Sequence, residues 1–276
     1  MIVPIGEILA AAAAAGGAAG AFNVIQLEHA EALVAGAEAA GRPVILQISE
    51  NTVRFHGALE PLALATLAVA RSSAAPVAVH LDHATGADLV HAAVALGIGS
   101  VMFDGSALSY ADNVAATAEV AGYCRSRGVA VEAELGEVGG KDGVHLPGAR
   151  TDPDEARRYV AGTGVDSLAV AVGTAHAMRT RAAHVDLDLI ARLRAAVPVP
   201  LVLHGSSGVP EADLAKAVVA GITKVNIATH LNGAYTGAVR ARLAADPDLV
   251  DPRRYTGPGR DAMAAEAARL LTLLSG

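Results

Sequence analysis

Short apolar stretches alternate with longer amphipathic stretches along the whole chain. The short stretches are rich in Val, Ile and Leu, and six of them directly follow a Pro or Gly, which can begin a strand without breaking it. The longer stretches, such as residues 27–40 and 85–96, carry apolar residues three and four positions apart, as on one face of a helix. The pattern predicts eight strands, at residues 21–24, 44–49, 77–82, 100–103, 129–134, 168–172, 201–204 and 224–227.

Eight such strand–helix units in one chain indicate an α/β protein with a closed (β/α)8 TIM barrel, with an open doubly wound sheet as the alternative. No linker or change of composition divides the chain, so we expect a single domain over residues 1–276. The Ala- and Gly-rich residues 8–22 predict a short N-terminal helix and a turn, and an extra helix is expected at the C-terminus. Residues 135–150 are Gly-rich and long for a simple turn, which predicts a mobile active-site loop.

Composition limits the classes of partner and cofactor. The hydrophobic fraction is 53%, but it comes largely from alanine, and no run of about 20 bulky apolar residues is present to span a membrane. A net charge of −7 argues against nucleic acids and anionic membranes as partners. No Lys or Arg precedes Arg42, unlike a secretory signal, so we expect a cytoplasmic protein. The single cysteine, Cys124, excludes a cysteine-based zinc cluster, so a bound metal must use histidines or carboxylates.

Polar side chains gather where six of the predicted strands end. Segments with His, Asp, Glu, Ser, Thr or Asn lie at residues 80–83, 104–106, 132–134, 173–176, 204–208 and 226–229. The carboxyl ends of the strands form the active-site rim of a (β/α)8 barrel. The sequence therefore predicts an active site at this rim.

Three of the ten histidines, His83, His176 and His204, lie directly after the third, sixth and seventh predicted strands. Three neutral imidazoles with an open fourth position make a catalytic Zn²⁺ site, which this spacing predicts. Strand alternation turns His80 into the barrel, where it can support a metal ligand. Asp82, beside a ligand, is the candidate for proton transfer, and orienting a histidine is its alternative role.

Two further segments predict a phosphate site. Residues 204–208 read HGSSG and lead into a helix start, where small residues expose backbone N–H groups. Residues 226–229 read NIAT, and they end the eighth strand and begin the next helix. The loops after strands seven and eight are the usual place for a phosphate in such barrels.

Over nearly its whole length the chain resembles the class II, metal-dependent fructose-bisphosphate and tagatose-bisphosphate aldolases. The resemblance rests on the ordered motifs GAFNV (20–24), QISE (47–50), HLDH (80–83), SVMFDGS (100–106), VEAELG (131–136), GTAH (173–176), HGSSG (204–208) and KVNIAT (224–229). It implies one Zn²⁺ per subunit on His83, His176 and His204, with Asp82 moving the proton of the substrate's C4 hydroxyl.

The resemblance also implies a substrate and an assembly. The substrate would be a ketose (bis)phosphate such as fructose or tagatose 1,6-bisphosphate, cleaved reversibly to dihydroxyacetone phosphate and an aldehyde. A monovalent cation such as Na⁺ near the phosphate, residues Glu132 and Glu134 near the metal, and a homodimer or homotetramer are further implications. Dihydroxyacetone phosphate would contact the phosphate-site and carbonyl-site residues Gly205, Ser206, Ser207, Asn226, Ala228 and Thr229, with Asn23 and Ser49 near the carbonyl.

Several positions depart from the pattern of this family. Ala177 stands after the second metal histidine, where many members have Gly, and His230 replaces the usual acidic residue after the NIAT motif. The segment 139–143 reads GGKDG where members often carry a proton-transferring Glu, so Asp142, beside Lys141, is a candidate substitute.

The departures leave the substrate and the activity open. Arg179 and Arg181 are candidates to bind a phosphate, sulfonate or carboxylate, which allows a non-glycolytic ketose phosphate as substrate. A degenerate barrel that binds metal and sugar phosphate without turnover is a second reading. A metal-dependent hydrolase is disfavoured because the first strand has no His-x-His pair. A Schiff-base aldolase is disfavoured because only three lysines exist, and we expect Lys224, at a strand start, at the far end of the barrel.

Overall fold

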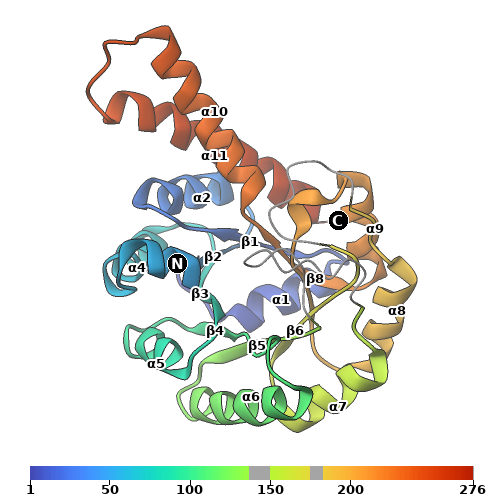
Figure 1. The fold of residues 1–276 in the computed structure, drawn as a ribbon. Helices are drawn as coiled ribbons and strands as arrows, with labels where there is room; N and C mark the ends of the chain where they lie inside the picture. The colour runs from blue at the N-terminus through green and yellow to red at the C-terminus, as the bar shows by residue number, and fades with distance from the viewer. Residues whose placement is uncertain (137–149, 175–182, 276) are drawn as a thin grey trace.

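Eight parallel strands close into a barrel in chain order in the computed structural model, which describes residues 1–136, 150–174 and 183–275 (Figure 1). This confirms the predicted (β/α)8 barrel and excludes the open doubly wound sheet. The strands are β1 (Ala19–Asn23), β2 (Val44–Ser49), β3 (Val77–Ala84), β4 (Ser100–Phe103), β5 (Ala130–Leu135), β6 (Ser167–Val170), β7 (Leu201–Leu203) and β8 (Ile222–Ile227).

Helices surround the barrel, and their apolar faces pack on the outside of the strands (Figure 1). The N-terminal and C-terminal helices expected from the sequence are both present. The helices are α1 (Ile5–Ala14), α2 (Leu27–Ala40), α3 (Glu50–His56), α4 (Glu60–Ser72), α5 (Ala87–Ala95), α6 (Tyr110–Arg125), α7 (Pro153–Thr163), α8 (Leu187–Ala196), the 3-10 turn η1 (Ser206–Gly208), α9 (Glu211–Ala220), α10 (Thr229–Ala245) and α11 (Arg253–Leu274).

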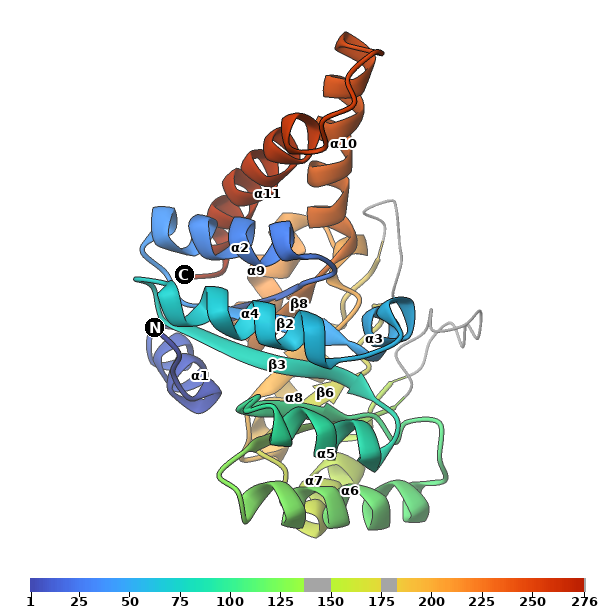
Figure 2. The same ribbon diagram turned by 90° about the vertical axis from the view of Figure 1, so that its left-hand side faces the viewer.

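The first helix fills the amino end of the barrel. Figure 2 shows α1 at the end of the strands opposite to α3. Its apolar residues Ile5, Ile8 and Leu9 form a buried cluster with small and apolar residues of the first three strands. Because this end is packed, the carboxyl ends of the strands are left to build a site, as the sequence predicts.

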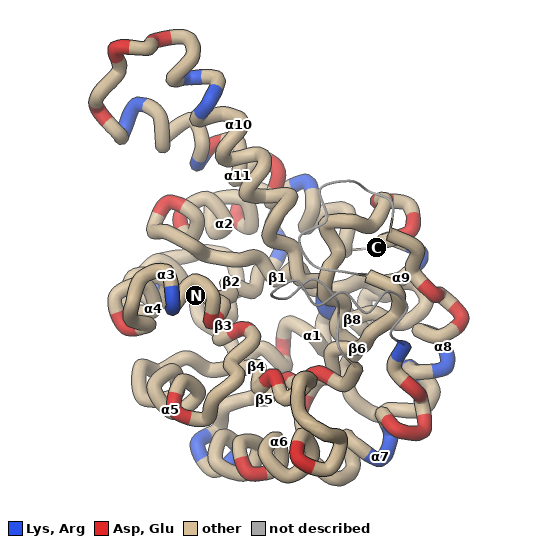
Figure 3. Tube along the Cα trace, viewed as in Figure 1, with Lys and Arg blue, Asp and Glu red and all other residues tan. Residues whose placement is uncertain are grey.

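Helices α10 and α11 form a hairpin that extends beyond the barrel, and α11 then returns to pack on α2 (Figures 1 and 2). Lys and Arg as well as Asp and Glu occur on the outer helices and on this hairpin, whereas α2 carries acidic positions only (Figure 3). The surface in this view therefore carries charges of both signs. Among the described residues, no helix is long and apolar enough to cross a membrane.

Strand bounds differ from the sequence prediction at functionally important places. The sequence put His83 beyond the third strand, but β3 continues to Ala84, which pairs with Phe103 of β4. This pairing follows a shift in register between Leu81 and Ala84, so the strand contains a bulge that apolar patterning does not reveal. Strand β8 begins at Ile222, two residues before the predicted start.

Helices α2 and α11 approach closely at Gly36. A Cβ atom added there would lie 2.6 Å from the Ala264 carbonyl oxygen and 2.8 Å from the Ala267 Cβ. We therefore expect Gly36→Ala to lower the free energy of unfolding by about 1–3 kcal/mol through overpacking, measured by urea denaturation. The control is Gly233→Ala on α10, where nothing lies within 4 Å and alanine favours the helix by up to about 1 kcal/mol. Equal stability of the two variants would contradict this close packing.

Candidate active site

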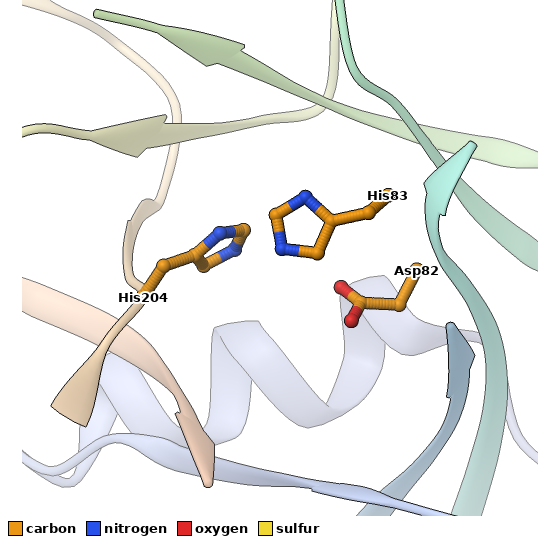
Figure 4. A group of neighbouring side chains, drawn as sticks. All are labelled: Asp82, His83 and His204. Atoms are coloured by element: carbon orange, nitrogen blue, oxygen red, sulfur yellow. The ribbon is translucent and has the colours of Figure 1, made fainter. Parts of the chain in front are cut away.

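A bulge in β3 brings two adjacent side chains to the same place. Successive residues of a regular strand point to opposite faces of a sheet. At His83 the backbone turns into the left-handed region, with φ at +54°, and among the described residues no other non-glycine has a positive φ. Such a conformation is costly for a bulky side chain and is typical of functional sites. Asp82 and His83 therefore both face the mouth of the barrel (Figure 4).

His204 approaches this pair from the end of β7. Its ring lies 4.7 Å from the His83 ring, centroid to centroid, at an interplanar angle of 73°. In Figure 4 the two rings lie next to each other in an edge-on arrangement, and the Asp82 carboxylate points to the same space. One ligand atom from each of the three residues lies within 4.8 Å of the other two.

A second set of possible ligands overlaps the first. The ligand atoms of His83, Asp104 and Glu134 also lie within 4.8 Å of one another, and His83 Nδ1 is 2.8 Å from Asp104 Oδ2. Imidazole nitrogens and carboxylate oxygens are ligands of Zn²⁺ and of other divalent transition metals. The residues present therefore fit a divalent metal ion. His176, the third predicted ligand, lies outside the described residues.

Two carboxylates hold the His204 ring from below. Glu132 and Glu134 are two positions apart on β5, so both face the barrel interior. His204 Nε2 is 3.1 Å from Glu132 Oε1, and Nδ1 is 3.1 Å from Glu134 Oε2. Burial lowers the pKa of His204, but its contacts with the two carboxylates outweigh this and raise the pKa to about 9. The pocket around His204 therefore favours a proton or another cation on its ring.

The expectation for Lys224 is corrected. Its Nζ donates to Glu132 Oε2 at 2.7 Å, and all of its side chain is buried. Burial raises the pKa of Glu132, but the Lys224 ammonium, His204 and His80 together outweigh it and hold the pKa far below its ordinary value. The long side chain extends from the amino-terminal half of β8 to Glu132, which in turn contacts His204. The spacing of residues along a strand does not indicate how far a lysine side chain extends. Lys224 does not line the cavity into which Asp82 and His83 open.

Two amide side chains donate to Asp82, and a third accepts from one of them. Asn226 Nδ2 donates to Asp82 Oδ1 at 3.3 Å, and Gln47 Nε2 donates to Oδ2 at 3.4 Å and to Asn23 Oδ1 at 2.7 Å. Burial raises the pKa of Asp82, but the neighbouring histidines outweigh it and hold the pKa below its ordinary value. The carboxylate is thus ionised and oriented. His80, by contrast, contacts Ser100 Oγ deeper in the barrel, and its burial lowers its pKa to about 3.

One cavity of about 390 Å³ connects these groups with the predicted phosphate site. Ser206 Oγ donates to the Asn226 carbonyl oxygen, which joins the turn after β7 to the end of β8. Among the residues that the structure describes, no side chain caps the N-terminus of α10 at Ala228, so its backbone N–H groups can bind an anion. The predicted residues that line the cavity are Asn23, Ser49, Asp82, His83, Gly205, Ser206, Ser207, Asn226, Ala228 and Thr229.

Other candidate residues lie elsewhere. Glu132 and Glu134 are beneath the cavity, where they contact His204. His230 contacts Glu266 and lines a separate space of about 20 Å³ behind the phosphate turn. The substitutions at Lys141 and Ala177 and the candidates Asp142, Arg179 and Arg181 lie outside the described residues.

Asp104 and Gln47 belong to motifs that were identified in the sequence, but neither residue was assigned a role in the site. Asp104, one position after β4, contacts His83, and Gln47 is a buried polar residue at a position of β2 that pairs with Asn23. The signal for Gln47 is a polar glutamine within an otherwise apolar stretch of the strand. Glu50, which also lines the cavity, ends the QISE motif but was given no role. Asn51, Arg54 and Thr85 had no signal beyond the polarity of their segments.

Comparison with known proteins gives consistent matches over the whole barrel. Residues 3–276 match the family described as fructose-bisphosphate aldolase class II. The YdjI aldolase from Escherichia coli K12 is 31% identical, with 99% of this chain and 97% of that chain covered and a TM-score of 0.86. A Coccidioides immitis protein assigned as a fructose-1,6-bisphosphate aldolase is 28% identical over 97% and 94% of the two chains, with a TM-score of 0.87.

A third solved structure, the fructose-bisphosphate aldolase from Campylobacter jejuni, is 22% identical over 99% and 95% of the two chains, with a TM-score of 0.80, and shows the shared fold. The family match covers more than nine tenths of the sequence, and it includes each of the described strands that carry the site. The chain belongs to the class II fructose-bisphosphate aldolase family.

Proposed function

We propose that this protein is a Zn²⁺-dependent aldolase that reversibly cleaves a ketose phosphate to dihydroxyacetone phosphate and an aldehyde. The observation that supports the proposal is the convergence of Asp82, His83 and the buried His204 next to a cavity that Asp82 and His83 line and that extends to the N-terminus of α10. An anion-binding end, a possible metal centre and an ionised carboxylate are the three parts that retro-aldol cleavage of a ketose phosphate requires.

The phosphate end of the cavity binds and orients the substrate. The N–H groups of the turn after β7 and of the first turn of α10 bind the phosphate, and the positive end of the helix dipole favours its charge. Ser207 and Thr229 add hydroxyl donors on the same side of the cavity, whereas the Ser206 hydroxyl donates to the Asn226 carbonyl oxygen. Asn23 and Ser49 then lie beside the carbonyl of the bound ketose. A monovalent cation such as Na⁺ at this end belongs to the same proposal.

Asp82 moves the proton in the cleavage step. The C3–C4 bond breaks, its electron pair is left on the dihydroxyacetone phosphate half, and the proton of the C4 hydroxyl passes to an Asp82 oxygen as C4 becomes the aldehyde carbon. Gln47 and Asn226 orient the carboxylate for this transfer. His83 and His204, with His176, would hold the metal ion, which supplies Lewis-acid stabilisation of the negative charge that develops on the ketone oxygen.

The test is metal removal combined with a retro-aldol screen. We expect a chelator to lower the rate of dihydroxyacetone phosphate release at least tenfold and added Zn²⁺ to restore it, because the developing negative charge then regains its counter-charge. Fructose and tagatose 1,6-bisphosphates and ketose 1-phosphates are the substrates. Unchanged activity after complete metal removal would contradict the metal dependence. Absence of release from every substrate by the Zn²⁺-loaded protein would favour a barrel that binds without turnover.

The proposal includes assembly of the chain as a homodimer or homotetramer. The hairpin of α10 and α11 extends away from the barrel and offers a surface for such contacts (Figure 2). Val250, between its two helices, is 89% exposed, and Leu243 on α10 is also exposed. Exposed apolar side chains on a projecting element are typical of subunit contacts.

A further inference from the structure

An ion pair lines the cavity at the β2–β3 side of the barrel, and the closed strand order puts β3 across the barrel from β7, which the phosphate turn follows. Glu50 and Arg54 lie one helical turn apart on α3, which directly follows β2, and both line the cavity with Asn51 and Thr85. Ser49 at the end of β2 pairs with Asp82 of β3, so this cluster lies just beyond the Asp82 carboxylate. If the proposed function holds, the atoms beyond C4 of the substrate lie here, because the phosphate occupies the opposite end.

Glu50 is fixed by contacts from two elements. It accepts hydrogen bonds from the Thr85 backbone N–H at 2.7 Å and from the Thr85 hydroxyl at 2.9 Å, and it pairs with Arg54 Nη2 at 2.5 Å. Burial raises the pKa of Glu50, but these hydrogen bonds outweigh it and hold the pKa below its ordinary value. Glu50 is therefore an anion that joins α3 to the segment after β3.

Arg54 keeps donors for a ligand. A guanidinium has five N–H donors, and Arg54 uses one on Glu50 and one on the Asn51 side chain at 3.2 Å. Its side chain is 56% exposed, whereas that of Glu50 is 16% exposed. Of the residues that the structure describes, no other Lys or Arg lines the cavity, whereas Glu50, Asp82 and Asp104 all do.

The charge balance at this end disfavours a second phosphate. Arg54 is already neutralised by Glu50, so a phosphate carrying about two negative charges would lie within a few ångströms of an ionised carboxylate. Hydroxyl groups suit the pair better, because each can accept from the Arg54 guanidinium or donate to a Glu50 oxygen. Asn51 and Thr85 add uncharged hydrogen-bonding groups of the same kind.

We propose, on the basis of the proposed function, that Glu50 and Arg54 determine specificity for a ketose 1-phosphate whose aldehyde half carries hydroxyl groups and no second phosphate. Arg54 donates to the hydroxyl oxygens, and Glu50 both orients Arg54 and repels a terminal phosphate. The reaction that follows would then consume an unphosphorylated hydroxyaldehyde.

The test compares two unreactive analogues, a hexitol 1-phosphate and the matching hexitol 1,6-bisphosphate, by calorimetry with the Zn²⁺-loaded protein. Neither contains a carbonyl group, so neither is cleaved, and binding is measured apart from turnover. We expect the 1-phosphate to bind at least as tightly as the 1,6-bisphosphate. Binding of the bisphosphate more than tenfold tighter would overturn the proposal.

Variants assign the preference to the pair. Glu50→Gln keeps an oxygen for the Thr85 N–H but removes the charge, so we expect the affinity ratio to move roughly tenfold toward the bisphosphate. Arg54→Gln, on an exposed side chain, should move the ratio the other way. The matched control is Glu60→Gln at the exposed start of α4, which should leave the ratio unchanged. Equal ratios in all three variants would overturn the role of the pair.

Turnover separates this proposal from the proposed function. The same protein is assayed for dihydroxyacetone phosphate release from ketose 1-phosphates and from 1,6-bisphosphates. The expected binding preference without release from any substrate would contradict the proposed function alone. Release with a higher kcat/KM for the 1,6-bisphosphates would contradict the specificity proposal alone.

Discussion

Asp82→Asn is expected to lower kcat for dihydroxyacetone phosphate release about a thousandfold, within the range of general acid–base catalysis, while the zinc content stays at one ion per chain. The amide has the shape of the carboxylate and can accept the Asn226 hydrogen bond, but it cannot take the C4 hydroxyl proton. The histidines, which would hold the ion, are unchanged. Steady-state kinetics and elemental analysis of the purified variant are the measurements.

The metal content decides between two roles for Asp82. The Asp82 carboxylate lies close enough to His83 and His204 to be a metal ligand. A carboxylate that binds the metal ion cannot also take the proton of the C4 hydroxyl. A variant that loses zinc together with activity would show that Asp82 holds the metal. Asp88→Asn in the exposed first turn of α5 is the matched control, and it should keep both activity and zinc.

The placement of the central residues was predictable because parallel strands converge. Asp82 and His204 lie at the carboxyl ends of β3 and β7, and a closed barrel directs such side chains toward one axis. The place of His83 was wrong in detail. A pattern of apolar residues has a period of two in any strand, so it contains no sign of the bulge that turns His83 beside Asp82.

Contacts between distant residues were beyond sequence reasoning. Glu50 and Thr85 are 35 positions apart, and Lys224 and Glu132 are 92 apart. Strand order and register decide which of these charged groups meet, and both arise only when the barrel closes. The polarity of the segment after β2 therefore gave no reason to select Glu50 and Arg54, although the ends of β7 and β8 could be assigned to a phosphate from their small residues and helix starts.

The buried ion pair beneath His204 leads to the second large effect. Lys224→Met removes the ammonium but leaves Glu132, which is fully buried, without its 2.7 Å partner. Removing one partner of a buried ion pair costs about 3–5 kcal/mol, and because His204 Nε2 still contacts Glu132, we expect the free energy of unfolding to fall by up to this amount at neutral pH. Urea denaturation of the metal-free protein measures it. A loss of stability below about 1 kcal/mol would show that the fold does not depend on the Lys224 charge beside Glu132.

The double variant Lys224→Met, Glu132→Gln separates lost charge pairing from lost packing. Glutamine can still accept from His204 Nε2, and with both charges removed no isolated carboxylate remains, so most of the stability should return. If the double variant is as unstable as Lys224→Met alone, the loss comes from packing around the lysine stem. Zinc affinity gives an independent readout, because the hydrogen bond to Glu132 orients the His204 ring. A glutamine there is a weaker acceptor than a carboxylate, and affinity should fall about 10- to 100-fold even when stability is regained.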